Sequence, residues 1–421
     1  MNIELYPKTL RGTINVPSSL TQTIINIILS SLCSTSTTII NPNFSEETFL
    51  TIDALKKFGV KFKKNADKLI IIPPKEWKEP NEAIECGIND SLIFLLMALT
   101  AYKVGKVSFH CSPEVIKQIE NNNSDSSTLN ISFLKTNGTI NIMKVEKLNK
   151  IILSDNTLPQ TILGAILFVV STESDFEITI NSLNNQNYVK LMLDILKSFN
   201  IQTNYHISEN SQTIIFDKCT PTSPNIIKLE GDWAIGSFLC IMGLSNERLI
   251  INNLSIDSFQ EEKEIINLLK STNNNLSIGS NTITIEKSNS MSKNYDLTSF
   301  PSLNIQLLTL SCISDGTSIF DNYHLLTSYY KKKLLSTIDI LKKLHADITL
   351  TEENIIINGK NTLEGGTLEN IKNYKHFLML LSILNNCVHP ITITNSNMLS
   401  LIDQSFIMEM KQLGLQIIEE I

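Results

Sequence analysis

The side chains able to do chemistry are spread thinly along this chain and form no spaced motif. Six histidines show no metal-ligand spacing, and neither a P-loop, a G-x-G-x-x-G run nor a nucleophile elbow accompanies them. They are His110, His206, His324, His345, His376 and His389. Of the 35 basic residues only Arg11 and Arg248 are arginine, which a biased base composition in the gene explains. We expect no metal centre and no glycine-rich phosphate loop.

The seven cysteines are scattered, and no two of them form a C-x-x-C pair. They are Cys33, Cys86, Cys111, Cys219, Cys240, Cys312 and Cys387. An odd number without regular spacing is typical of buried thiols in a reducing compartment rather than of a disulfide framework. We therefore expect reduced cysteines and a cytoplasmic protein.

Composition and charge exclude several classes of partner. The 421 residues are 42% hydrophobic and 18% charged, with a net charge of −7, which fits a globular protein and argues against nucleic acid as the partner. The start of the chain lacks a signal-peptide pattern, and the longest apolar runs, near 92–101 and 161–170, fall short of the roughly 18 residues of a membrane span. A monomer without a membrane segment is expected.

The elements that would position a site follow one repeated plan, seen first in residues 37–62. A β-branched strand leads through a polar corner into a helix with apolar residues at i, i+3 and i+4, and a second strand follows. Ser45 is expected to cap this helix, with acidic Glu46 and Glu47 in its first turn, and Gly59 to end it.

Copies of this plan recur about seventy residues apart, too widely for a solenoid. They lie at 177–201, 249–278, 317–348 and 390–417, with a weaker copy from Val107. Each copy has a second, almost wholly apolar helix upstream, which predicts a buried helix. These helices are expected near 23–32, 91–102, 160–170, 234–243, 305–311 and 375–384. Six units in a chain of this length predict two domains of three units.

The segment LRGTINVPSSLTQTIINIILSSL joins a strand, a proline, a polar loop and a buried helix. It resembles the opening of 5-enolpyruvylshikimate-3-phosphate (EPSP) synthases, whose pattern is G-x-I-x-x-P-G-S-K-S-x-x-x-R. Gly12 and Pro17 keep this frame. Leu20 stands where the family has its catalytic lysine, Thr21 follows as a substrate-binding candidate, and Ile25 replaces an arginine.

Further landmarks that resemble the family follow in its order. The run CGINDS resembles the G-N-S-G-T-x-x-R loop, with Asn89 as a substrate-binding candidate and Phe94 in place of the arginine. The run LPQ resembles the S-S-Q turn and keeps its glutamine as Gln160. The run NQNY resembles S-x-P-Y, which makes Asn185 and Tyr188 candidates.

The second half of the chain resembles the family while lacking its acids and bases. The run FPS resembles x-P-D, so Ser302 stands where the family has an aspartate base. The run YYKKK lies over K-E-x-D-R, so Tyr330 replaces the glutamate and Lys333 the arginine. The run YKH lies over D-H-R and puts His376 at another arginine position, while EGDWAIGSF resembles E-G-D-x-S-S-A-S-Y.

The resemblance implies a two-domain α/β (α+β) fold, an inside-out α/β barrel. Each domain would hold three βαβαββ repeats with helices inside and sheets outside. Residues 18–227 would form one domain, and residues 1–17 with 228–421 the other. Hinges are expected near Gly12 to Pro17 and near Pro221 to Lys228, and the cleft between the domains is the default site.

The resemblance also implies a reaction of the shikimate pathway, which uses no cofactor and no metal. An enolpyruvyl group passes from phosphoenolpyruvate to shikimate 3-phosphate, so two phosphates and two carboxylates must be held by arginine or lysine side chains. Protons must also move, which requires positioned acids and bases. No catalytic residue is retained at Leu20, Ser302 and Tyr330, so transferase activity is expected to be weak or lost.

Three hypotheses therefore stay open. The first is a degenerate EPSP synthase with little or no activity. The second is a working EPSP synthase or related enolpyruvyl transferase with a rebuilt site, favoured by the substrate-binding candidates Gln160, Tyr188 and Lys333. The third is a non-catalytic binding or regulatory protein on the same fold. As plain structural residues, Lys333 would belong to a solvated lysine face and Tyr188 would start a helix.

Overall fold

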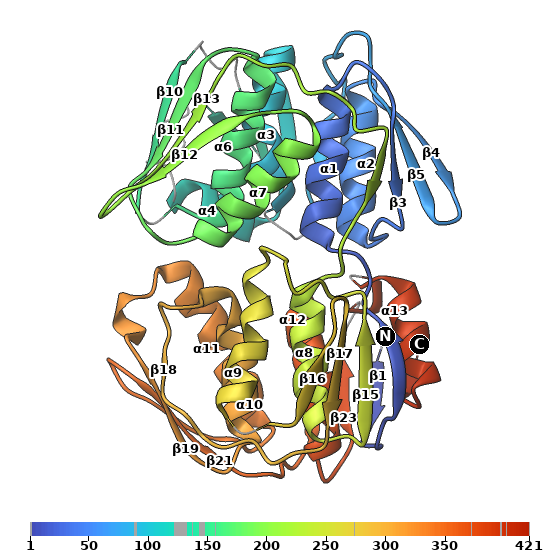
Figure 1. Cartoon of the computed structure of the whole chain (residues 1–421), viewed down its shortest axis with the longest axis vertical. Coiled ribbons are helices and arrows are strands. Elements are labelled where there is room, and N and C mark those ends of the chain that lie inside the picture. Colours follow the sequence, from blue (N-terminus) through green and yellow to red (C-terminus); the bar gives the residue numbers. More distant parts are fainter. Residues whose placement is uncertain are drawn as a thin grey trace. The chain divides into compact units, whose positions relative to one another are not determined.

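One strand order recurs in six four-stranded sheets within the part of the chain that the computed structural model describes (Figure 1). The described residues are 2–87, 91–121, 133–136, 138–142, 148–155, 157–272, 274–371, 373–395, 398–400 and 402–420. In the sheet ordered β18-β19-β21-β20, for example, the pair β18 and β19 is parallel and the other pairs are antiparallel. The chain divides into two compact units, Ser19–Leu229 (the continuous unit) and Met1–Ser18 with Glu230–Ile421 (the split unit).

The continuous unit contains three of these sheets, ordered β14-β3-β5-β4, β6-β7-β9-β8 and β10-β11-β13-β12. Its strands are β3 (Thr37–Ile40), β4 (Lys61–Asn65), β5 (Lys68–Ile72), β6 (Ile84–Glu85), β7 (Val107–His110), β8 (Phe133–Thr136), β9 (Thr139–Ile142), β10 (Lys150–Leu153), β11 (Phe176–Ile180), β12 (Thr203–Ile207), β13 (Gln212–Phe216) and β14 (Ile226–Lys228). Its helices are α1 (Leu20–Leu32), α2 (Glu46–Lys57), α3 (Ser91–Val104), α4 (Pro113–Asn121), α6 (Pro159–Thr172) and α7 (Gln186–Ser198).

The split unit contains the sheets β16-β17-β15-β2, β18-β19-β21-β20 and β22-β23-β1-β24. Its strands are β1 (Asn2–Tyr6), β2 (Gly12–Asn15), β15 (Arg248–Asn252), β16 (Leu276–Ile278), β17 (Thr282–Glu286), β18 (Tyr295–Asp296), β19 (Gly316–Asp321), β20 (Asp347–Leu350), β21 (Ile355–Gly359), β22 (Gly366–Glu369), β23 (Ile391–Thr394) and β24 (Gln416–Glu420). Its helices are α8 (Trp233–Leu244), α9 (Ile265–Ser271), α10 (Asn304–Cys312), α11 (Ser328–Lys343), α12 (Tyr374–Ile383) and α13 (Gln404–Gln412), with 3₁₀ turns η1 (Glu261–Glu264), η2 (Pro301–Leu303), η3 (Tyr323–Leu325), η4 (Leu384–Asn386) and η5 (Met398–Ser400).

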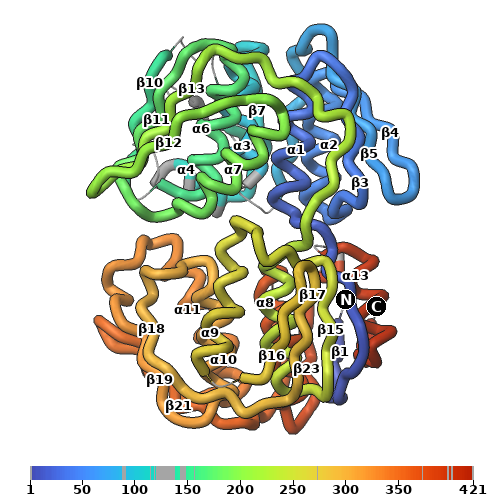
Figure 2. Tube along the Cα trace, in the orientation of Figure 1, coloured from blue at the N-terminus to red at the C-terminus, as the bar shows by residue number. Residues whose placement is uncertain are grey.

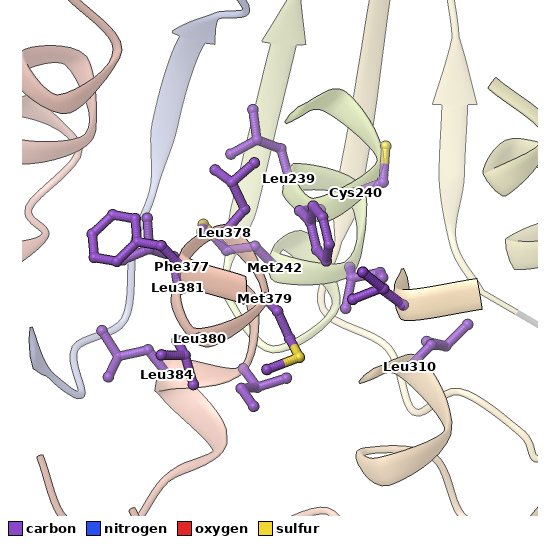
Figure 3. Packing of buried hydrophobic residues seen from close by; sticks show 14 of the residues in the cluster. Leu239, Cys240, Met242, Leu310, Phe377, Leu378, Met379, Leu380, Leu381 and Leu384 are labelled. Atoms are coloured by element: carbon purple, nitrogen blue, oxygen red, sulfur yellow. The ribbon is translucent and has the colours of Figure 1, made fainter. Parts of the chain in front are cut away.

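The all-apolar helices form the interior, as their composition predicts. Every residue of α8 is buried, and α8, α10 and α12 contact one another in the split unit. Figure 3 shows Leu239 and Met242 of α8, Leu310 of α10 and Phe377 of α12 in this core. Each such side chain stabilises the fold by roughly 1.5–3 kcal/mol when it leaves water. The predicted α/β fold of repeated βαβαββ units is confirmed.

The predicted cap of α2 is only partly right. The helix starts after Ser45, with Glu46 and Glu47 in its first turn, and Gly59 follows its end with φ +98°. The Ser45 side chain makes no capping hydrogen bond within the described residues. Instead the backbone N–H of Ser45 donates to Asn43 Oδ1 at 3.1 Å, so Asn43 holds this turn.

None of the helices in the described ranges has the length and hydropathy needed to cross a bilayer.

Candidate functional site

Four of the predicted site residues lie at the starts of helices in the split unit. Ser302 is in η2, Tyr330 and Lys333 are in the first turns of α11, and His376 is in the first turn of α12. With their neighbours they form what we call the polar cluster. Its members are Asp232, Glu261, Glu262, Ser302, Tyr329, Tyr330, Lys333, Lys375 and His376.

Ser302 is bound to a carboxylate from a distant part of the chain. Its hydroxyl donates to Glu261 Oε2 at 2.5 Å, and its backbone N–H donates to the same oxygen at 3.0 Å. Glu261 opens η1, while Ser302 lies in η2, and these two short turns contact each other. The carboxylate of Glu261, which belongs to another element, therefore lies beside Ser302.

Tyr330 is partly buried against the core and packs edge-on against Tyr329, with ring centroids 5.2 Å apart. Burial raises the pKa of the Tyr330 hydroxyl, and Tyr329, Glu261 and Glu262 raise it further. The hydroxyl therefore stays protonated at neutral pH. Tyr330 can donate a hydrogen bond, but it cannot serve as the base that a glutamate would be.

Lys333 is turned toward the aromatic pair. Its ammonium donates to the Tyr329 hydroxyl and lies 4.0 Å from the centre of the Tyr329 ring. Both contacts follow from the helix, because residues four apart in α11 are on the same side. The Lys333 side chain is partly exposed and is held by Tyr329.

Lys375 forms a largely buried ion pair. Its Nζ lies 3.1 Å from Glu262 Oε1, and the two side chains are 20% and 9% exposed. Burial alone would lower the pKa of Lys375, but the charge and hydrogen bond of Glu262, with the charge of Asp232, outweigh it and raise that pKa. Lys375 is therefore fully charged at neutral pH and already neutralised by protein carboxylates.

His376 is buried and uncharged. Its Nε2 lies 3.1 Å from Thr337 Oγ1, and that hydroxyl donates to the Lys333 carbonyl at 2.9 Å. Burial, with help from the positive charge of Lys333, lowers the pKa of His376 to about 4. At neutral pH this side chain therefore supplies no positive charge.

The polar cluster contains more negatively charged than positively charged side chains, so its charge does not favour the binding of anions. Three carboxylates, Asp232, Glu261 and Glu262, face two ammonium groups, Lys333 and Lys375. Asp232 also caps α8, because its Oδ1 accepts from the backbone N–H groups of the first turn at 2.9 and 3.4 Å. Among the residues that the structure describes, no group of three or more His, Cys, Asp or Glu is arranged for a metal.

The remaining predicted residues belong to the continuous unit. Leu20 and Thr21 open α1, Gln160 is the second residue of α6, and Tyr188 is the third residue of α7. Because α6 contacts both α1 and α7, these side chains lie on the first turns of three neighbouring helices.

Asn185 immediately precedes α7, with φ 63°, and its amide donates to the Thr157 carbonyl at 3.4 Å. Tyr188 is a partly buried helix-start residue, as its plain structural interpretation expected. Phe94, which the motif resemblance sets at an arginine position, is 3% exposed in the core of α3 and α6. Asn89 lies outside the described residues.

Sequence reasoning missed Glu261 and Glu262, which the structure places in the polar cluster. Both follow a turn fixed by Gln260, whose amide donates to Glu230 Oε1 at 3.0 Å and to the Gly231 carbonyl at 2.8 Å. The expected helix here begins as the 3₁₀ turn η1, and α9 starts only at Ile265. The sequence shows these residues only as two acidic residues at the start of an expected helix. Acidic residues are common there because they interact favourably with the helix dipole, so nothing marked them as members of a site.

The fold is that of the enolpyruvyl transferases. It matches the EPSP synthase of Acinetobacter baumannii with a TM-score of 0.77 at 16% identity, covering 99% of each chain. It also matches the enolpyruvyl transferase NikO of Streptomyces tendae with a TM-score of 0.76 at 13% identity, covering 99% of this chain and 98% of that one.

The sequence assigns the chain to one family among the proteins with this fold. The family model of EPSP synthase (3-phosphoshikimate 1-carboxyvinyltransferase) matches residues 6–401, and the chain belongs to this family. Its relatives include the 3-phosphoshikimate 1-carboxyvinyltransferases of Clostridium novyi (strain NT), 25% identical over 94% of this chain and 93% of the relative, and Clostridium kluyveri, 24% identical over 99% and 98%. The resemblance stated from the motifs is confirmed.

Proposed function

We propose that this member of the EPSP synthase family keeps the fold and performs enolpyruvyl transfer weakly or not at all. The observation that carries the proposal is the charge balance of the polar cluster. Its cations are paired with groups of the protein, its carboxylates outnumber them, and His376 is neutral. A site for phosphoenolpyruvate and shikimate 3-phosphate would need the opposite balance.

The binding argument is electrostatic. Each of the two substrates carries a phosphate and a carboxylate, and such groups are held best by several guanidinium or ammonium groups. Lys375 would have to leave Glu262 to bind one of them, which would strand a buried carboxylate that is 9% exposed. Leaving a buried charge without its partner typically costs about 3–5 kcal/mol, so an anion at this position would bind poorly.

The chemical argument concerns protons. Ser302 donates its hydroxyl to Glu261, and Tyr330 keeps its proton at neutral pH, so neither is a base. Removing one acid, base or electrostatic donor typically lowers a rate by about 10²- to 10⁴-fold. The separate losses do not add, but together they leave little of the reaction.

Titration calorimetry tests the binding argument. We expect no heat of binding when phosphoenolpyruvate, shikimate 3-phosphate or both are added to the wild-type chain at millimolar concentration. Glu262→Gln removes the partner of Lys375 and should create measurable phosphoenolpyruvate binding. Glu264→Gln is the matched control, because Glu264 lies in the same 3₁₀ turn and accepts a hydrogen bond from the Asn267 side chain at the surface. Micromolar binding by the wild-type chain would refute the proposal.

A second candidate function rests on Glu261. Its carboxylate contacts Ser302, so a rebuilt enolpyruvyl transferase could use Glu261 where the family uses an aspartate. In that case the wild-type chain turns over both substrates, and Glu261→Gln lowers the rate by about 10²-fold or more. If Glu261→Gln and the wild-type chain are equally inactive, this candidate is wrong.

A further inference from the structure

Two cysteines of the continuous unit lie at the ends of neighbouring parallel strands. Strand β6 pairs with β7 in the register Ile84 with Phe109 and Glu85 with His110. The ladder continues past β6, because the backbone N–H of Cys86 donates to the His110 carbonyl at 3.0 Å. The same register places Cys86 opposite Cys111.

This register is compatible with the Cα separation that a disulfide requires. Neighbouring strands are about 4.8 Å apart, and residues paired in register point to the same face of the sheet. A disulfide joins residues whose Cα atoms are about 4.4–6.8 Å apart. Cys86 is 0% exposed and Cys111 5% exposed, so both side chains are directed into the interior.

The thiols also interact with each other. The side-chain contact with Cys111 is the largest of the causes that raise the pKa of Cys86, ahead of burial. Four other buried thiols differ, since burial alone raises the pKa of each to about 12: Cys33, Cys240, Cys312 and Cys387. Cys86 and Cys111 are therefore a pair of adjacent thiols, and not two isolated buried residues.

We propose that Cys86 and Cys111 form a modification site, a dithiol that hydrogen peroxide converts reversibly into an intrachain disulfide. Cys111, the more exposed thiol, attacks one peroxide oxygen; the O–O bond breaks, a sulfenic acid forms and one water leaves. Cys86 then attacks the Cys111 sulfur; the S–O bond breaks, the S–S bond forms and a second water leaves. The two thiols lose two electrons and two protons, and the peroxide accepts them.

The disulfide would fix two elements to each other. Cys111 immediately precedes Ser112, whose hydroxyl accepts from the Val115 N–H at 3.3 Å in the first turn of α4. The bridge would join the end of β6 to this turn and close a loop of roughly 25 residues, which stabilises a chain by constraining its unfolded state. This inference does not depend on the proposed loss of transferase activity.

Peptide mapping of the oxidised wild-type chain tests the proposal. The full-length protein is treated with hydrogen peroxide, blocked, digested without reductant and analysed by mass spectrometry. We expect one cross-linked peptide pair containing Cys86 and Cys111, two fewer free thiols than the seven of the reduced chain, and full reversal by dithiothreitol. The oxidised chain should also unfold at a higher temperature than the reduced chain.

Single substitutions supply the controls. Cys219→Ser changes a half-buried thiol elsewhere in the unit and should leave the cross-link intact. Cys86→Ser and Cys111→Ser should each abolish it. The mapping of the wild-type chain decides the matter even if one of these variants folds poorly. Oxidation of the folded protein without this cross-link, or with cross-links spread equally over other cysteines, would overturn the proposal.

Discussion

At the scale of single residues, His376 shows how burial removes the charge of a basic side chain. The imidazole is 4% exposed, contacts Thr337 and lies close enough to Lys333 to be affected by its charge. Burial and this charge disfavour the imidazolium form. The residue is basic in type, yet it contributes hydrogen bonding and packing instead of charge.

We predict that His376 stays neutral when ordinary histidines become protonated. Its pKa is lowered to about 4, whereas an unperturbed histidine has a pKa of about 6.5. Below pH 6.5 the unfolded chain therefore binds a proton that the folded chain does not, so the free energy of unfolding falls from pH 6.5 to about pH 4. The loss is up to about 3 kcal/mol.

Histidine NMR titration and urea unfolding at several pH values measure these quantities. His376→Gln should flatten the pH dependence of stability in this range. An imidazole signal of His376 that titrates near pH 6.5 would contradict the prediction.

The ion pair of Glu262 and Lys375 gives a second prediction at this scale. Glu262→Gln or Lys375→Met alone leaves one charge in a largely buried position and should lower the free energy of unfolding by about 3 kcal/mol. The double variant should lose much less than the sum, because neither charge is then left alone. Chemical denaturation of the wild-type chain, the two single variants and the double variant gives the four free energies of this double-mutant cycle. If the losses of stability were additive, the two side chains would not be coupled.

The order of the motifs along the sequence singled out Ser302, Tyr330 and His376 as candidates. Ser302 follows a proline, and Tyr330 and His376 lie at helix starts, which are features that a sequence shows. Motif order could not place Glu261. The contact between Glu261 and Ser302 joins residues 41 positions apart, and a sequence does not show which of many acids folds back on a given turn. The charge state of His376 was equally hidden, since it depends on burial and on Lys333.

At the scale of elements, the contact between α3 and α6 depends on the absence of one side chain. A Cβ atom at Gly164 of α6 would lie 2.1 Å from the carbonyl oxygen of Phe94 in α3. Real Cβ atoms cannot come so close to backbone oxygen, so the two helices would have to separate. Gly164 therefore sets how closely these buried helices approach.

We predict that Gly164→Ala lowers the free energy of unfolding by about 3 kcal/mol. The matched control is Gly279→Ala, because the nearest atom to a Cβ at Gly279 lies 3.5 Å away. This control should change stability by less than about 1 kcal/mol. Urea unfolding of both variants provides the measurement, and an equally stable Gly164→Ala would mean that α3 and α6 are not held this closely.

The elements themselves were largely predictable, since the apolar composition of α1, α3, α6, α8, α10 and α12 requires burial. The 3₁₀ turn η1 before α9 could not be predicted. It is accompanied by side-chain contacts of Gln260 and Glu261 with residues distant in the sequence, and local helix propensity does not include such contacts.

At the scale of the whole chain, the fold depends on strands supplied from far away in the sequence. Strand β1 lies between β23 and β24, with Asn2 opposite Glu420, and β2 pairs with β15. In Figure 2 the blue N-terminal segment that contains β1 runs among the yellow-green to red segments of the split unit. The N-terminal residues thus complete two repeats of the split unit. Spacing alone predicted six repeats, but not which strand completes each one, because strand pairing is not local.

We propose that the chain keeps the family's fold while its transferase activity is weak or lost. The most direct test is a turnover assay that follows phosphate release from phosphoenolpyruvate in the presence of shikimate 3-phosphate. The 3-phosphoshikimate 1-carboxyvinyltransferase of Clostridium novyi serves as the positive control under the same conditions. We predict a rate at least about 10⁴-fold below that of the control, because Tyr330 and Ser302 are not bases and the carboxylates of the polar cluster outnumber its ammonium groups. A rate within about tenfold of the control would contradict the account.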